Sequence, residues 1–353
     1  MTIEYLDSKR IKGTAEDRTG APAVSGGWKE LGRTTLGSGN TNINVASIPD
    51  KRYYMILRNT LGRGGGHGTN GGYIINNDSG SNYAVSRSGN GGNWADNANF
   101  SDLDLWDANS PQILGVDYMV NKSDKEKLLI GYVNDGNTAG AGNAPMRAKI
   151  AGKWANTSDV INRIDLDTMN STTWNSGSEV VVLGWDPDDT HTTNFWEELA
   201  SVELSSASDT LSSGTITAKK YLWFQYFIKG NASGRQKIQF NGDTGSNYSY
   251  RYSGNGAADS VANTDTPNIN ATYAYANNNK FGNFFVVNNS ANEKLLTGVS
   301  LESIAGAGNA PNRTEVVGKW DTTGSQITNI AVWADGGGSA YNTGSFIKVW
   351  GSN

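Results

Sequence analysis

Carboxylates are the side chains of this sequence whose spacing comes nearest to a reactive or metal-binding site. Two acidic clusters offer several oxygen atoms close together, as calcium binding or paired acid and base catalysis would require. The clusters are Asp102, Asp104 and Asp107, and Asp186, Asp188 and Asp189. Neither spacing matches an EF-hand loop. Solvated turn carboxylates are the favoured interpretation, a structural calcium site is the alternative, and we predict no metal and no catalytic residue.

Histidine and glycine give equally weak signals for chemistry. The only two histidines are His67 and His191, and no serine is surrounded by the residues of a nucleophile elbow. The segment Gly66–Gly71 fits the letters of a dinucleotide fingerprint, but the short strand expected after it offers no helix N-terminus for a pyrophosphate. The sequence therefore predicts no cofactor.

The most regular pattern in the chain is a repeated turn. Asp78–Tyr83 reads Asp-Ser-Gly-Ser-Asn-Tyr, and Asp243–Tyr248 reads Asp-Thr-Gly-Ser-Asn-Tyr. Asp and Asn tolerate turn geometry, Gly can supply a positive φ, and Tyr begins the next strand, so the pattern is typical of a tight hairpin. The alternative is a sugar-binding loop, in which Asp and Asn bind hydroxyls while an aromatic ring stacks on the sugar.

A second repeated pattern contains residues typical of protein interfaces. Ala139-Gly-Ala-Gly-Asn-Ala-Pro-Met-Arg147 returns as Ala305-Gly-Ala-Gly-Asn-Ala-Pro-Asn-Arg313, and each copy is followed by Gly-Lys-Trp. The favoured interpretation is a long loop leading into a core strand with the Trp inside, and the alternative is an interface, because Arg and Trp are frequent interface anchors. From both patterns, our candidates for interface or glycan contact are Tyr83, Arg147, Lys153, Trp154, Tyr248, Tyr250, Arg251, Tyr252, Arg313, Lys319 and Trp320.

These patterns recur about 165 residues apart, which is the length of a domain rather than of a solenoid repeat. The sequence therefore predicts a tandem duplication. We expect an N-terminal arm over 1–26, a first repeat over 27–186, a linker over 187–195 and a second repeat over 196–353.

Short alternating segments bounded by turn residues predict about eight strands in each repeat. In the first repeat the candidates are 52–58, 72–75, 83–87, 113–120, 127–133, 147–154, 160–167 and 179–185; in the second they include 221–228, 238–240, 284–287, 314–320, 327–333 and 345–350. This pattern favours an all-β fold of two tandem jelly-roll-like antiparallel β-sandwiches. We expect the two sandwiches to lie close together because the linker is short.

Composition excludes several classes of protein. The 353 residues include 44 glycines and no cysteine, and the net charge is −5, so disulfides and a basic nucleic-acid-binding surface are not expected. No apolar run is long enough for a signal peptide or a membrane span. We expect synthesis in a cytoplasm, no membrane partner, and release by lysis if the protein acts outside the cell.

The chain resembles a family of phage and environmental-virus virion proteins. The resemblance lies in Tyr5–Thr14, in the Trp-x-Glu-Leu start of each repeat, in Phe240–Tyr252 and in the Gly-Lys-Trp strand, and it covers most of both repeats. It implies a β-sandwich component of a bacteriophage virion, such as a capsid decoration protein, a head fibre or a tail-associated protein. It supplies no catalytic residues.

Residues and resemblance together predict a non-enzymatic virion structural protein. We expect it to bind a major capsid or tail lattice protein through the arm and the repeat surfaces, and to form a homo-oligomer. The first alternative is a tandem carbohydrate-binding module that recognises host or surface glycans. Further alternatives are a double jelly-roll capsid shell protein and, least favoured, a glycan-cleaving enzyme.

Overall fold

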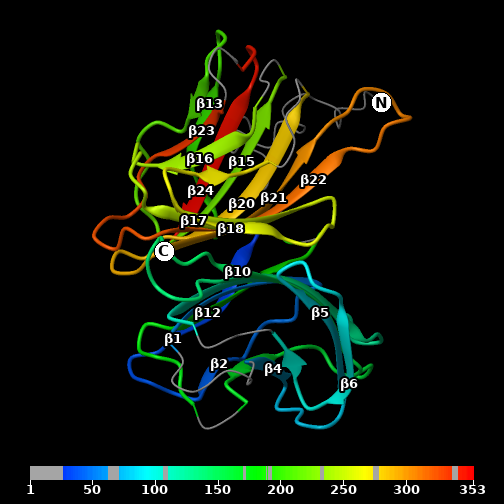
Figure 1. Cartoon of the computed structure of the whole chain (residues 1–353). Coiled ribbons are helices and arrows are strands. Elements are labelled where there is room, and N and C mark those ends of the chain that lie inside the picture. Colours follow the sequence, from blue (N-terminus) through cyan, green and yellow to red (C-terminus); the bar gives the residue numbers. More distant parts are fainter. Residues whose placement is uncertain are drawn as a thin grey trace, which may run out of the picture.

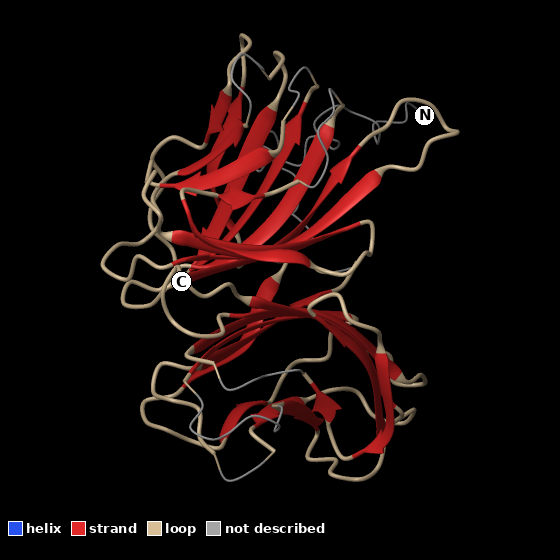
Figure 2. Cartoon of the chain, viewed as in Figure 1, coloured by secondary structure: helices blue, strands red, loops and turns tan. Residues whose placement is uncertain are grey.

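The computed structural model describes residues 27–62, 71–105, 110–169, 172–187, 189, 193–230, 234–272, 278–335 and 341–353. These residues form strands and loops only (Figure 2). No helix long and apolar enough to cross a membrane occurs in this part of the chain. The expected N-terminal arm lies outside the described residues.

The first domain stacks an eight-stranded antiparallel sheet on a four-stranded one (Figure 1). In spatial order the large sheet consists of β1 (Lys29–Thr35), β12 (Glu179–Trp185), β3 (Tyr53–Leu61), β8 (Gln112–Val120), β9 (Lys127–Asp135), β10 (Met146–Trp154), β5 (Tyr83–Gly89) and β6 (Ala95–Phe100). The small sheet consists of β2 (Asn42–Ala46), β11 (Arg163–Asp167), β4 (Gly72–Ile75) and β7 (Leu103–Asp104).

The second domain repeats this plan strand for strand. Its large sheet is β13 (Glu197–Glu203), β24 (Phe346–Ser352), β15 (Tyr221–Ile228), β20 (Lys280–Val287), β21 (Lys294–Glu302), β22 (Asn312–Trp320), β17 (Tyr248–Gly254) and β18 (Ser260–Thr266). Its small sheet is β14 (Thr210–Ser212), β23 (Ile330–Ala334), β16 (Gln236–Phe240) and β19 (Ile269–Asn270). The duplication predicted from sequence is therefore matched in the order of the strands.

Strands from opposite ends of each unit pair with one another. In the first domain β1 pairs with β12, β2 with β11 and β5 with β10, and this nested arrangement is that of a rolled-up jelly-roll-like sandwich. Each sandwich encloses its own apolar core between the two sheets, with Trp154 in the first core and Trp320 in the second. The predicted fold class, two tandem antiparallel β-sandwiches, is confirmed.

The expectation of about eight strands per repeat was too low, because each domain has twelve strands among the described residues. The pattern of alternating apolar residues did not reveal β1, β6 and β7, nor their counterparts in the second domain. β6 reads Ala-Asp-Asn-Ala-Asn-Phe and is largely exposed, so no apolar face signals it. Hydrogen bonding to the neighbouring strand β5 holds it in the sheet.

Candidate functional site: the domain junction and the open face

The two large sheets face each other and bury a third apolar core between the domains (Figure 2). Its buried members are Met55, Leu57, Leu114, Val116, Val181 and Leu183 from the first domain, and Phe195, Trp196, Tyr221, Phe285, Val287 and Leu295 from the second. On β3, Tyr54 and Ile56 point into the first sandwich while Met55 and Leu57 point into the junction. The strand β3, over residues 53–61, is therefore apolar on both faces.

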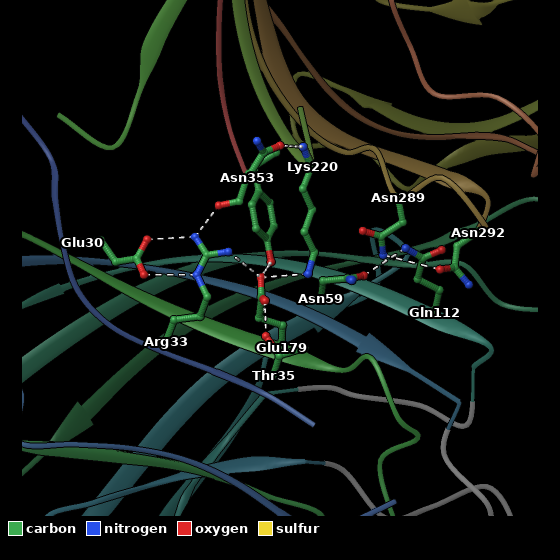
Figure 3. Close-up of polar contacts among 11 residues, drawn as sticks. Glu30, Arg33, Thr35, Asn59, Gln112, Glu179, Lys220, Asn289, Asn292 and Asn353 are labelled. Carbon is green, nitrogen blue, oxygen red and sulfur yellow. Dashed lines mark hydrogen bonds and ion pairs between the residues drawn. The ribbon is translucent and has the colours of Figure 1, made fainter. Parts of the chain in front are cut away.

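Glu179 is the polar centre of one side of this junction (Figure 3). Its carboxylate accepts hydrogen bonds from the hydroxyls of Thr35 and, at 2.8 Å, Tyr221, and it pairs with Lys220 at 3.0 Å and Arg33 at 3.4 Å. Burial alone would raise the pKa of Glu179, but Thr35, Lys220 and Arg33 outweigh it and hold the pKa below its usual range. A first-domain carboxylate thus stays ionised between groups of both domains.

Arg147 forms a second polar contact across the junction. Its guanidinium pairs with Asp259 and with Glu315 of the second domain, and Lys149 also reaches Glu315, at 2.9 Å. The Arg147 side chain is only 5% exposed. Because two carboxylates surround one buried guanidinium, losing Arg147 would leave both without their main partner.

The loop 139–145 lies on the second domain through main-chain atoms. Ser249 donates its hydroxyl to the carbonyl of Asn143 at 3.0 Å, and Arg251 donates Nε to the carbonyl of Pro145 at 2.9 Å. Just before the loop, Lys319 donates Nζ to the carbonyl of Thr138 at 2.7 Å. Small side chains let the backbone approach the sheet this closely.

The described residues leave the other half of the same first-domain sheet uncovered. The open face consists of Trp28, Tyr53, Tyr118, Leu128, Ile130 and Trp185, which line a shallow, almost wholly apolar groove of about 420 Å³. Leu128 is 54% exposed and Ile130 is 53% exposed. The rings of Tyr53 and Trp185 stack with centroids 5.5 Å apart. An adjoining groove of about 530 Å³ extends past Leu128 and Ile130 to Lys153 and β6.

The repeated Asp-x-Gly-Ser-Asn-Tyr segment has a structural position in both domains. Asp78 accepts hydrogen bonds from the indole of Trp154 at 2.7 Å and from the amide of Gly80 at 2.9 Å, and Asp243 makes the same contacts with Trp320 and Gly245. Tyr83 and Tyr248 lie in the cores. This geometry favours the structural interpretation over a sugar-binding loop.

Two details of the hairpin prediction were wrong. The segment connects β4 of the small sheet to β5 of the large sheet, so it does not join paired strands. Positive φ occurs before the Asp, at Asn76 and Asn77, and not at Gly80. Asp78 donates its amide to the carbonyl of Ile75 at 2.9 Å, which closes the turn on those two left-handed residues.

The eleven candidate contact residues separate into three groups. Six residues are buried in the sandwich cores: Tyr83, Trp154, Tyr248, Tyr250, Tyr252 and Trp320. At the junction between the domains are Arg147, Arg251 and Lys319. Only Lys153 and Arg313 keep side chains more than 40% exposed. Sequence reasoning missed the open face, because its apolar residues read as ordinary core.

Most described members of the two acidic clusters form ion pairs, and they do not gather into a metal site. Asp104 pairs with Arg87, and Asp189 pairs with Lys51. Burial, with repulsion from Asp104 and Asp167, raises the pKa of Asp102 to about 6. No group of three or more potential ligands occurs within the described ranges. His67, His191, Asp107, Asp188 and Gly66–Asn70 lie outside those ranges.

No family model matches the chain. No curated protein matches it. Among solved structures, the mouse laminin alpha1 chain, domains LG4-5, aligns with 11% identity over 93% of this chain and 92% of that chain, at a TM-score of 0.19. The resemblance to virion proteins stays a prediction.

Proposed function

We propose that this chain is a non-enzymatic structural protein that binds a protein partner through the open face, as a component of a virion. The observation that carries the proposal is the exposure of Leu128 and Ile130 beside aromatic rings on a regular sheet. Contiguous apolar surface of this kind marks interaction sites on soluble proteins. A groove with aromatic walls and few polar atoms suits the apolar anchors of another protein.

The absence of an enzymatic role is part of the proposal. A hydrolytic site needs an acid and a base with differently tuned pKa values in one cleft. Asp102 has a raised pKa, but its carboxyl is buried, with 6% of the residue exposed, against Gly72 of the small sheet, and it does not line the open face. Its place favours a structural over a catalytic role.

The virion assignment is the finer part of the proposal and rests on the sequence resemblance. A capsid-decorating, head-fibre or tail-associated protein would bind a capsid or tail lattice protein, and two tethered domains raise the effective concentration of the second contact. Synthesis in the host cytoplasm belongs to the same proposal.

Electron cryo-microscopy of virus particles released from cells that produce this protein tests the proposal. We expect the chain at regular stoichiometry on a shell or tail, with the open face in contact with another protein. Leu128→Arg should reduce incorporation at least about tenfold, since it places a charge in an apolar contact. Ala207→Arg, the same kind of change in an exposed loop, is the control. A chain absent from particles, or full incorporation of Leu128→Arg, would refute the proposal.

Glycan binding is the second candidate function, and the stacked rings of Tyr53 and Trp185 favour it. Aromatic rings can carry sugar rings, and Lys153 and Glu126 at the edge of the open face offer polar groups for hydroxyls. It predicts saturable binding to a polysaccharide that Trp185→Ala weakens. Tyr248→Ala is unsuited to this test because Tyr248 is buried. No binding across a panel of bacterial surface polysaccharides would exclude it.

A further inference from the structure

One heptapeptide occurs twice in this chain with the same conformation. Ala139–Pro145 and Ala305–Pro311 both read Ala-Gly-Ala-Gly-Asn-Ala-Pro. In the first copy Asn143 donates its side-chain amide to the carbonyl of Ala139 at 3.0 Å, and in the second Asn309 donates to Ala305 at 2.7 Å. Gly140 and Gly306 have φ of +90° and +86°. Both loops are therefore built alike.

Their surroundings differ completely. Ala141 and Ala144 of the first loop are each 4% exposed because the second domain covers them. Every residue of the second loop, 305–311, is exposed. The large apolar residues that are exposed in the described part of the second domain, Phe281, Leu301 and Ile304, lie at this same end of the sheet. The second loop thus has the conformation of the docked first loop, but no other described residue covers it.

The surface that receives the first loop also exists twice. Strand pairing places Leu128 opposite Lys153 in the first domain and Leu295 opposite Lys319 in the second, so these pairs are equivalent. The same register relates Tyr53 to Tyr221 and Tyr118 to Phe285. Each member of the second set is buried in the junction, whereas each member of the first set lies on or beside the open face.

The polar groups beside this surface are repeated as well. Lys319 approaches Glu293 at 3.6 Å and donates to the carbonyls of Gly136 and Thr138, just before the first loop. Lys153 and Glu126 occupy the equivalent strand positions and pair at 3.0 Å at the edge of the open face. Lys153 remains 43% exposed, so its ammonium is accessible to an incoming carbonyl.

We infer that a second copy of this chain docks its loop 305–311 on the open face of the first domain. This inference rests on the proposed function, in which the open face binds protein. Within one chain, the loop of the first domain docks on the receiving face of the second domain, so the junction is head-to-tail. Among the described residues, the loop of the second domain and the open face of the first domain do not take part in it. A repeated head-to-tail contact closes into a ring or continues as a filament.

The intermolecular contact is expected to be weaker than the junction. Ala84 and Ser86 stand in the first domain where Ser249 and Arg251 donate to the loop in the second, so two hydrogen bonds have no counterpart. In the second domain, Gln225 and Asn283 occupy the strand positions that Leu57 and Val116 occupy in the first. Two apolar junction residues of the first domain therefore have polar counterparts in the second. Association also lacks the tether that joins the two domains. We therefore expect a dissociation constant above about 1 μM.

Two single-site variants of the full chain test the inference by sedimentation, from micromolar to about millimolar concentration. Wild type should associate as concentration rises. Leu128→Arg blocks the face and Ala310→Arg blocks the loop, and each should weaken self-association at least about tenfold. The control Ala207→Arg should associate like wild type. Mixing Leu128→Arg with Ala310→Arg should restore a 1:1 dimer, because one variant keeps the loop and the other keeps the face.

Three results would overturn the inference: a wild-type chain that stays monomeric, association that both variants leave unchanged, or a mixture that forms no dimer. Its failure is distinguishable from failure of the proposed function. A monomeric chain that still enters particles through the open face would refute self-docking alone, whereas normal incorporation of Leu128→Arg would refute the open face as the site of partner binding.

Discussion

Leu128 and Leu295 occupy the same position in two copies of one domain, yet Leu128 is 54% exposed and Leu295 is fully buried. The reverse holds for the arginines that follow the repeated loop. Arg147 is buried between Asp259 and Glu315, while its counterpart Arg313 is 46% exposed. Each domain thus buries, in the junction, the half of its large sheet that stays exposed in the other domain.

The difference shows that the junction is not a two-fold contact between like surfaces. In an isologous pair the same residues of both copies would be buried, and a duplicated chain could satisfy all its surfaces by itself. Here the two domains use different halves of equivalent sheets. The energetic importance of a residue therefore depends on which copy contains it.

The largest effect that separates the copies is expected at the arginines. Arg147→Ala should lower the free energy of unfolding by about 3–5 kcal/mol, because it removes the buried guanidinium that pairs with Asp259 and leaves Glu315 with only Lys149 and the half-exposed Arg313. Arg313→Ala should change it by about 0.5 kcal/mol or less, because that side chain is half exposed. Thermal unfolding of both variants measures the contrast. Equal losses would mean that the junction does not distinguish the two arginines.

The leucines give the next largest contrast. Leu295→Ala should cost about 2–5 kcal/mol, since it opens a cavity in the apolar core between the domains. Leu128→Ala should cost less than about 1 kcal/mol, because its side chain already contacts water. Chemical unfolding in urea, compared with wild type, checks both values. A large loss for Leu128→Ala would show that the open face is covered within one chain.

Sequence could predict the sandwiches because their cores depend on local alternation, which is visible in single segments. In β12, Glu179–Trp185, the predicted bounds match the observed strand. The duplication was visible for a similar reason, since both copies need the same turn and the same Asp–Trp hydrogen bond. The candidates Trp154 and Trp320 were assigned to contacts, but that bond holds their indoles inside the domains.

The junction could not be predicted from one sequence. Tyr53 and Tyr221 are the same residue type at equivalent positions, and only the packing of the whole domains makes one part of the open face and the other buried. A β3 segment that is apolar on both faces signals burial on both sides. The pattern does not tell which domain packs against the second face of the strand. That information lies in contacts between residues far apart in the chain.

A pH-dependent contrast is expected at Asp102, next to the small sheet of the first domain. Asp102 and Asp104 of the first domain correspond by strand pairing to Asn268 and Asn270 of the second. Because the pKa of Asp102 is raised to about 6, the folded state holds this proton more tightly than the unfolded chain does. Stability contributed by protonated Asp102 is therefore present below about pH 4 and is lost as pH rises through 6.

Asp102→Asn copies the second domain and should remove this dependence. We expect the variant to be more stable than wild type by about 1–3 kcal/mol at pH 7, and to match it near pH 4. Thermal unfolding at both pH values measures the difference. A variant that is destabilised at pH 7 would show that ionised Asp102 contributes favourably, through Arg87 or another neighbour.

The smallest contrast is expected where the copies are alike. Asp78 and Asp243 each accept a 2.7 Å hydrogen bond from a core indole and further bonds from the turn, and neither touches the junction core. Replacing either with Ala should cost about 1–3 kcal/mol, because it leaves a buried indole N–H unpaired. The two losses should agree within about 0.5 kcal/mol, and differential scanning calorimetry can measure both. If Asp243→Ala cost much more than Asp78→Ala, the turn of the second domain would also stabilise the junction. The conclusion that the two domains are alike inside and differ in which surfaces they bury would then be wrong.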